Sequence, residues 1–361
     1  MNYREALLLS PEDLGASGTK VIDINVDKPI SRIDIKFKTT KASQGMSAGS
    51  PANITKIELV DGSQVLHSLT GYENQALAYY SRPPGVVMDH GQHISTLSEM
   101  DLYSIDFGRW LWDEMLAFIP GNFHNPQLKI TFDENVSDTS ASENECEVWA
   151  RIFDEKVISP MGFLSAIEHY SYTCGADNSF ETITMPEDRI YRQLLVRAFQ
   201  EGYEPWHQID EARFDEGTLD RIPFEYTNLE TYYRTMKSVW PMIVQQAALI
   251  STAAGLIFYI PATDYYAGGV FQGLGGTTEV HHTNASSRGG QLALTGTGEI
   301  NILGMVFGYL PWHCYQFPMG MKNVIDDWYN PAGKKPRLRL RASTGATSGT
   351  GQVVIEELHK Y

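Results

Sequence analysis

The chain has 361 residues, of which 42% are hydrophobic and 20% are charged, with 31 glycines and 17 prolines. This composition excludes disordered and fibrous proteins, and the length suffices for two hydrophobic cores. The formal net charge is −16 and no run of Lys and Arg exceeds two residues, so direct binding of nucleic acid is not expected.

The N-terminal segment "MNYREALLLSPEDLG" has three consecutive leucines followed at once by acidic residues. It is too short and too charged for a secretory signal, so we expect synthesis and folding in a cytoplasm. We interpret this segment as an arm in front of the first domain.

The next residues alternate between apolar and polar side chains, which is typical of strands with one buried face. In "KVIDINVDKPISRIDIKFK", residues 20–38, isoleucines and Phe37 alternate with Asp, Asn and Lys. The segment "ECEVWARIF", residues 145–153, alternates in the same way. Short helices are expected in the connections, at "ENQALAYY" (73–80), "RWLWDEML" (109–116) and "TNLETYYRTM" (227–236).

The two halves of the chain repeat one another. "NPQLKITFDEN" at 125–135 is echoed by "KKPRLRLRAST" at 334–344, and Pro336 follows Pro126 by 210 positions. Other blocks match in the same order, among them "ISRIDIKFK" with "IYRQLLVRAF", "AYYSR" with "TYYR", and "ECEVWARIFDE" with "GQVVIEELHKY". Such long-period similarity predicts an all-β fold of two tandem eight-stranded jelly-roll sandwiches, over residues 1–157 and 158–361.

The second half carries a long insertion at about residues 235–300. From Tyr80 to Phe107 the chain uses 27 residues, whereas the matching stretch from Tyr233 to Phe317 uses 84. Residues 238–263 contain no charged side chain and are long enough to span a bilayer, but Pro, Gln, Ser, Thr and Gly dilute their hydrophobicity. We therefore expect a buried helix to about residue 253 and then a buried strand. Residues 267–298, which are rich in glycine, are expected to form long exterior loops.

Four histidines are candidate metal ligands. "HGQH" contains His90 and His93, and His281 and His282 are adjacent, but neither pair has a third ligand nearby in the sequence. Both pairs lie in polar, glycine-rich stretches. We interpret them as solvated loop histidines.

The remaining candidates also favour structural interpretations. His313 and Cys314 are adjacent, but their aromatic neighbours indicate core packing. Three cysteines far apart in the sequence, Cys146, Cys174 and Cys314, are expected to be buried free thiols. Acidic pairs have the residue types of glycosidase carboxylates, but in an acidic chain we interpret them as solvated surface pairs, Asp326–Asp327 and Glu356–Glu357. The sequence thus predicts no enzyme and no catalytic, cofactor-binding or metal site.

From about Lys20 to Tyr361 the chain resembles the double jelly-roll major capsid proteins of tailless icosahedral viruses with an internal membrane, the lineage that includes adenovirus hexon. The segments "ITKIELVDGSQVLHSLTGYENQALAYY" and "MPEDRIYRQLLVRAF" look like core strands and turns of prokaryotic members. The modest length of the chain resembles that of capsid proteins from small bacterial or archaeal viruses rather than that of a hexon.

The resemblance implies a structural role in the virion. Homotrimers would form pseudo-hexameric blocks that tile a shell beside neighbouring trimers and minor capsid or vertex proteins. The N-terminal region would contact an internal membrane or a neighbouring subunit. The alternative is a glycan-binding or glycan-hydrolysing protein with two jelly rolls. That class would carry a secretion signal and often a calcium-binding loop, and the sequence shows neither.

Overall fold

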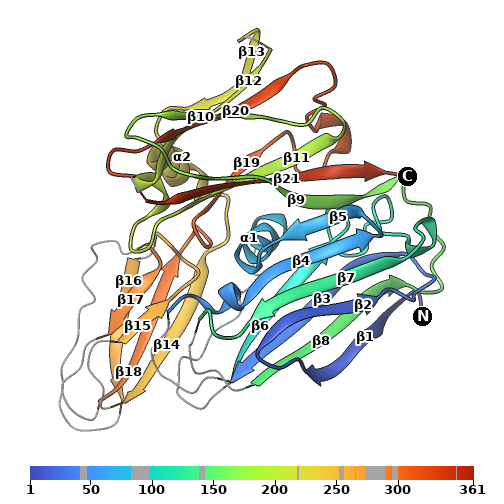
Figure 1. Ribbon diagram of the computed structural model, residues 1–361, viewed down its shortest axis with the longest axis horizontal. Helices are drawn as coiled ribbons and strands as arrows, with labels where there is room; N and C mark the ends of the chain where they lie inside the picture. Colours follow the sequence, from blue (N-terminus) through green and yellow to red (C-terminus); the bar gives the residue numbers. More distant parts are fainter. Residues whose placement is uncertain are drawn as a thin grey trace.

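The structure, a computed structural model, is built mainly of β-strands (Figure 1). It describes residues 1–40, 47–82, 98–137, 143–217, 219–251, 256–264, 266–273, 289–294, 300–346 and 348–361. The first series of elements is β1 (Tyr3–Asp13), β2 (Ser17–Asp23), β3 (Ile30–Thr40), η1 (Ser50–Asn53), β4 (Ile54–Asp61), β5 (Gln64–Leu69), α1 (Gly71–Ser81), β6 (Ser98–Asp106), η2 (Pro120–Asn122), β7 (Pro126–Asp133) and β8 (Glu143–Phe153).

The second series repeats this order, with five additional strands. Its matching elements are β9 (Gly162–Thr173), β10 (Phe180–Thr184), β11 (Ile190–Phe199), η3 (Pro205–His207), β12 (Ile209–Glu216), β13 (Arg221–Tyr226), α2 (Leu229–Met236), β19 (Cys314–Pro318), η4 (Ile325–Asp327), β20 (Pro336–Ala342) and β21 (Thr350–Lys360). The additional strands between α2 and β19 are β14 (Ile243–Ser251), β15 (Leu256–Tyr259), β16 (Tyr266–Gly273), β17 (Gln291–Leu294) and β18 (Ile300–Gly308).

The sheets match strand for strand. In the first series the strand orders are β1-β8-β3-β6 and β2-β7-β4-β5, and in the second they are β9-β21-β11-β19 and β10-β20-β12-β13. A parallel bridge between Ser68 of β5 and Ile167 of β9 joins one sheet of each series into a single eight-stranded sheet (Figure 1). The prediction of two tandem jelly rolls, with short helices in the connections, is therefore confirmed.

The strands form where apolar side chains alternate. On β3, Ile33, Ile35 and Phe37 are at most 1% exposed, while the residues between them are partly exposed. On β8 the predicted apolar face is fully buried, with Cys146, Val148, Ala150 and Ile152 all at 0%. Burial of such a face is the main favourable contribution to folding, at about 25 cal/mol per Å² of apolar surface.

Each unit contributes residues to the core of the other. Most of the first core lies between the two sheets of the first series, but it also includes Phe163 of β9. The second core includes Ala76, Leu77, Tyr79 and Tyr80, which all belong to α1 of the first series. The two units are thus packed together through α1 and the start of β9.

Helix α1 begins with a complete capping box. The Thr70 hydroxyl accepts a hydrogen bond from the Glu73 backbone N–H, and the Glu73 carboxylate accepts one from the Thr70 backbone N–H. Glu73 is fully buried, and burial together with nearby Glu168 raises its pKa to about 7. A capped start and a buried body fix the position of this helix between the units.

The N-terminal segment, which was expected to be an arm, forms strand β1. It pairs with β8, with two register shifts, one between Leu7 and Leu9 and one between Leu9 and Glu12. Ala6, Leu8 and Leu9 pack against the first core, so two of the three consecutive leucines have apolar partners within their own unit, whereas Leu7 is exposed. This packing explains why the segment joins the sheet.

The helix expected at residues 109–116 does not form. Trp112 has a φ of 69°, in the left-handed region, which an α-helix excludes. Its ring packs against Tyr3 and Phe153, with centroid distances of 4.5 and 5.5 Å. The Arg109 guanidinium bonds the Asp113 carboxylate at 2.7 Å and closes the turn. Tertiary contacts therefore override the local helical pattern.

The insertion contains strands where we expected a helix and loops. The predicted buried helix is β14, which pairs with β18 from Ile243 opposite Gly308 to Ser251 opposite Ile300. The periodicity of an uncharged apolar run does not distinguish a helix from a strand. Here backbone pairing with β18 makes the segment a strand. Strands β16 and β17 occupy part of the predicted loop at 267–298, residues 289 and 290 form a turn before β17, and residues 274–288 and 295–298 lie outside the described residues. In the described residues no helix combines the length and apolar character needed to cross a bilayer.

Replacing Gly71 by alanine is expected to destabilise the protein by about 1–3 kcal/mol, because overpacking forces the backbone apart. A Cβ at Gly71 would lie 2.3 Å from the Pro51 carbonyl oxygen of η1, which cannot move without shifting that turn. Gly121→Ala is the matched control, since a Cβ there meets nothing within 4 Å. Thermal unfolding of the two variants should separate them, and equal midpoints would contradict the prediction.

Candidate functional site

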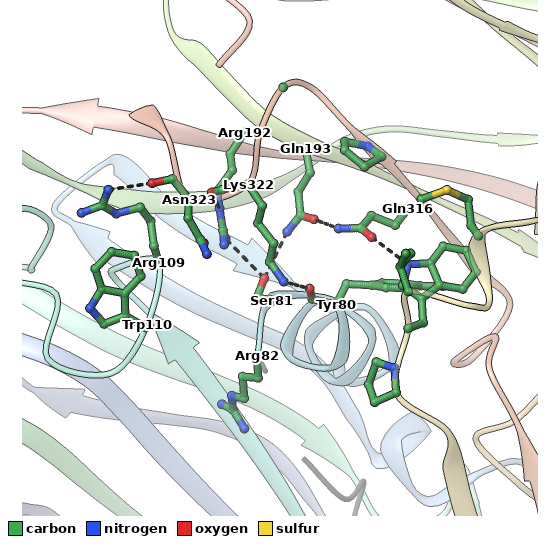
Figure 2. Close-up of a pocket in the computed structure, with 16 residues that line it drawn as sticks. Tyr80, Ser81, Arg82, Arg109, Trp110, Arg192, Gln193, Gln316, Lys322 and Asn323 are labelled. Carbon is green, nitrogen blue, oxygen red and sulfur yellow. Dashed lines mark hydrogen bonds between the residues drawn. The ribbon is translucent and has the colours of Figure 1, made fainter. Parts of the chain in front are cut away.

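A cavity with a volume of about 610 Å³ lies at the junction between the two units (Figure 2). The C-terminal end of α1 forms one wall, and β11, β19 and the segment after β19 form the opposite wall. Trp110 of the first unit and Trp240, which follows α2, also line it. This junction cavity therefore brings together residues that are far apart in the sequence.

A buried ion pair borders the cavity on the side of the second unit. Arg192 of β11 and Glu356 of β21 are 1% and 2% exposed. Nη1 of Arg192 lies 2.9 and 2.8 Å from the two carboxylate oxygens of Glu356. Gln193 donates to the same carboxylate at 2.6 Å and to the Ser81 hydroxyl at 3.1 Å. Ser81 is the last residue of α1, so this cluster holds the helix end against the second unit.

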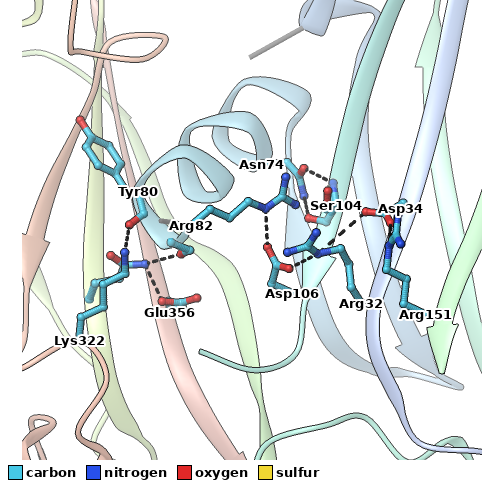
Figure 3. A network of polar contacts seen from close by, with 12 residues as sticks. Arg32, Asp34, Asn74, Tyr80, Arg82, Ser104, Asp106, Arg151, Lys322 and Glu356 are labelled. Carbon is cyan, nitrogen blue, oxygen red and sulfur yellow. Dashed lines mark hydrogen bonds and ion pairs between the residues drawn. The ribbon is translucent and has the colours of Figure 1, made fainter. Parts of the chain in front are cut away.

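A second ion cluster holds the same helix end against the first unit (Figure 3). Arg82, which follows α1, donates from Nε to the Asp106 carboxylate at 3.2 Å, and Arg32 of β3 bonds the other oxygen. Burial alone would raise the pKa of Asp106, but Arg82 and Arg32 hold it below its ordinary value. The end of α1 is thus fixed by charged groups from both units.

Lys322 approaches the helix end from the segment after β19. Its ammonium donates to the Tyr80 carbonyl oxygen, where the negative end of the helix dipole favours a cation (Figure 2). Burial and the nearby charge of Arg192 lower the pKa of Lys322 to about 8. Arg109 lies across the cavity, where it donates to the Asn323 carbonyl oxygen at 2.8 Å and stacks on Trp110 at 4.2 Å.

Tyrosines from both helices converge on β19. The Tyr80 hydroxyl of α1 donates to the Cys314 carbonyl oxygen at 2.7 Å, and the Tyr232 hydroxyl of α2 donates to the Gln316 carbonyl oxygen. The Trp240 ring lies between the helices, 5.2 Å from the Tyr80 ring and 6.1 Å from the Tyr233 ring. The sequence repeat that paired "AYYSR" with "TYYR" therefore corresponds to two helices that flank one strand.

Several residues singled out in the sequence are placed as expected. His313 is 5% exposed, its Nε2 lies 3.2 Å from the Tyr203 carbonyl oxygen, which accepts the hydrogen bond, and burial lowers its pKa to about 3. The three cysteines are buried and free, and burial raises the pKa of each thiol. Asp326 and Asp327 are exposed. The four loop histidines, His90, His93, His281 and His282, lie outside the described residues.

The prediction of a surface position for Glu356 and Glu357 is wrong. Both are buried because each has an arginine partner: Arg192 for Glu356, and Arg189, at 2.5 Å, for Glu357. The ion pair of Arg192 was missed altogether. Its signal was a charge inside "IYRQLLVRAF", a strand whose near-continuous apolar run indicates burial on both faces.

The side chains around the cavity can hold the two units together or bind a ligand. The carboxylates beside it are held by arginines, and Cys314 has a pKa shifted away from the reactive thiolate. Within the described ranges, no group of three or more His, Cys, Asp or Glu side chains is arranged to hold a metal ion.

Comparison with solved structures shows that the whole chain has the fold of viral capsid proteins. The major capsid protein P2 of bacteriophage PM2 is 9% identical, with a TM-score of 0.56 over 99% of this chain and 98% of that chain. The STIV major capsid protein is 8% identical, with 0.59 over 98% and 96%. A capsid structure of PBCV-1 virus is 9% identical, with 0.58 over 99% and 93%. No family model and no curated protein matches the sequence.

Proposed function

We propose that this chain is a structural major capsid protein that forms homotrimers and, with neighbouring trimers, an icosahedral viral shell. The observation that carries the proposal is the pair of tandem jelly rolls, with matching strand orders, along nearly the full length of the chain and of the capsid proteins that share the fold. The proposal includes a boundary at residues 157/158, a virion location and no enzymatic activity. Minor capsid or vertex proteins and an internal membrane are further proposed partners.

The contact between the two units supports a trimer, because the strands that form this contact have equivalents at sheet edges in the other half of the repeat. Within the chain, β5 and α1 of the first unit meet β9 and β19 of the second. In the repeat, β13 and α2 of the second unit correspond to β5 and α1. Likewise, β1 and β6 of the first unit correspond to β9 and β19. In the described residues β13, β1 and β6 are edge strands. A head-to-tail contact of the same kind between copies closes a ring when its rotation closes.

One position illustrates this correspondence. Trp312 packs in the joint, where its ring lies 5.0 Å from the Tyr72 ring of α1 and its indole N–H donates to Gln75 at 2.7 Å. The residue 210 positions earlier is Leu102 of β6, which is 54% exposed. On β13, Ile222 is 40% exposed. Exposed apolar residues at these matching edges fit a surface that another copy covers.

Sedimentation of the purified chain at micromolar concentration is expected to give about three times 40.5 kDa. Leu102→Asp and Ile222→Asp should each yield a folded monomer, because a charge at an apolar contact is costly to bury. Val157→Asp is the control, since Val157 is 92% exposed and lies between the units. A wild-type monomer at all concentrations, or trimers of both edge variants, would contradict the proposed assembly.

A further inference from the structure

The junction cavity has a positive lining in an acidic protein. Four cationic residues line it, Arg82, Arg109, Arg192 and Lys322, and no Asp or Glu is among the described residues that do so. The chain as a whole has a formal net charge of −16. The carboxylates that partner the arginines lie behind them, so the surface that faces the cavity is positive. A water-filled space with such walls concentrates anions.

Unused hydrogen-bond donors lie in and beside the cavity. In the described part of the chain, Nη2 of Arg192 and Nη2 of Arg82 are buried without a hydrogen-bond partner. Arg192 is 1% exposed, and its other nitrogens bond Glu356, Ser81 and the Lys322 carbonyl oxygen. The Lys322 ammonium has three N–H donors, of which the bond to Tyr80 uses one. The two remaining ammonium N–H groups of Lys322 are therefore the donors that an acceptor bound in the cavity could use.

The rest of the lining is apolar, and the cavity is large enough for a small molecule. Trp110, Met236, Val239, Trp240 and Pro318 surround the cationic end. The volume of about 610 Å³ lies within the range of small-molecule sites, which is roughly 300–1,000 Å³, and exceeds the needs of a single inorganic ion.

From this arrangement we infer that the junction cavity binds an oxyanion of the phosphate type, with the Lys322 ammonium as the principal donor and the positive charge of the neighbouring arginines behind it. A guanidinium and an ammonium are the two side-chain groups that recognise phosphate. The phosphate is either free or a monoester whose hydrocarbon part contacts Trp110 and Trp240. Trp110 belongs to the first unit and Lys322 to the second, so a ligand that contacts both would link the two jelly rolls. The inference concerns a single chain and does not depend on assembly into a shell.

Calorimetric titration of the full chain with inorganic phosphate, at constant ionic strength, tests the site. We expect saturable binding at one site per chain. Lys322→Gln should weaken binding at least about tenfold, because a charged hydrogen bond is lost. Lys322→Arg keeps the charge and should bind within a few-fold of wild type. Lys360→Gln is the matched control, since Lys360 is exposed at the end of β21, and should leave binding unchanged.

A parallel titration with hexyl phosphate distinguishes the two sources of the anion. If the apolar lining contributes, the monoester should bind at least about tenfold more tightly than inorganic phosphate, for which two buried methylenes suffice. Equal affinities would assign the site to the free ion. Absence of saturable binding for both compounds would overturn the inference. The same affinity in Lys322→Gln, Lys360→Gln and wild type would also overturn it.

Discussion

Arg192→Met is expected to destabilise the protein by about 3–5 kcal/mol, because it leaves a buried carboxylate without its cation. Glu356 is 2% exposed and lies 2.8–2.9 Å from Arg192 Nη1. Gln193 continues to donate to Glu356 at 2.6 Å, which favours the lower end of that range. For units of this size the loss corresponds to a fall of roughly 6–20 °C in the thermal midpoint.

Two further variants isolate the cause. In Arg192→Met combined with Glu356→Leu both charges are absent, so most of the lost stability should return, as buried pairs are often neutral when replaced together by apolar residues. Arg221→Met removes an ion pair to Glu216 from a side chain that is 62% exposed, and should cost no more than about 1 kcal/mol. If Arg192→Met were as mild as Arg221→Met, the buried pair would not be a fixed part of the fold.

The architecture could be predicted because the two halves of the chain carry the same sequence pattern in the same order. No single match, such as Pro126 with Pro336, is informative, but their common order required two equivalent sets of strands. The structure confirms this down to the order of strands within each sheet. The buried alternation on β3 and β8 was visible for the same reason, since it depends only on a period of two.

The errors arose where distant contacts decide the local structure. Residues 109–116 have helix-forming composition, but Trp112 adopts a left-handed backbone and packs against Tyr3 and Phe153. Strand β14 exists because β18 pairs along its whole length. The junction cavity required knowledge of which unit receives the end of α1, and no periodicity in the sequence carries that information.

Tyr80→Ala is expected to uncouple the two units. Tyr80 belongs to the first unit but is 3% exposed within the second core, where its ring lies 4.9 Å from Tyr79 and 5.2 Å from Trp240. Truncation of a buried aromatic residue costs about 3–5 kcal/mol. It also leaves the Cys314 carbonyl oxygen without its donor at 2.7 Å. Because the lost contacts join the units, each unit should keep its own core and lose its partner.

Scanning calorimetry should therefore show one unfolding transition for the wild type and two for Tyr80→Ala. Tyr80→Phe retains the ring and loses only the hydroxyl, so it should keep a single transition at a cost of about 1 kcal/mol. Tyr232→Ala is the matched control, because Tyr232 is 7% exposed and bonds Gln316 within the second unit. It should destabilise the second unit without uncoupling its unfolding from that of the first unit. A single, merely lowered transition for Tyr80→Ala would mean that α1 is not what couples the jelly rolls, and that the strand contact between β5 and β9 is sufficient.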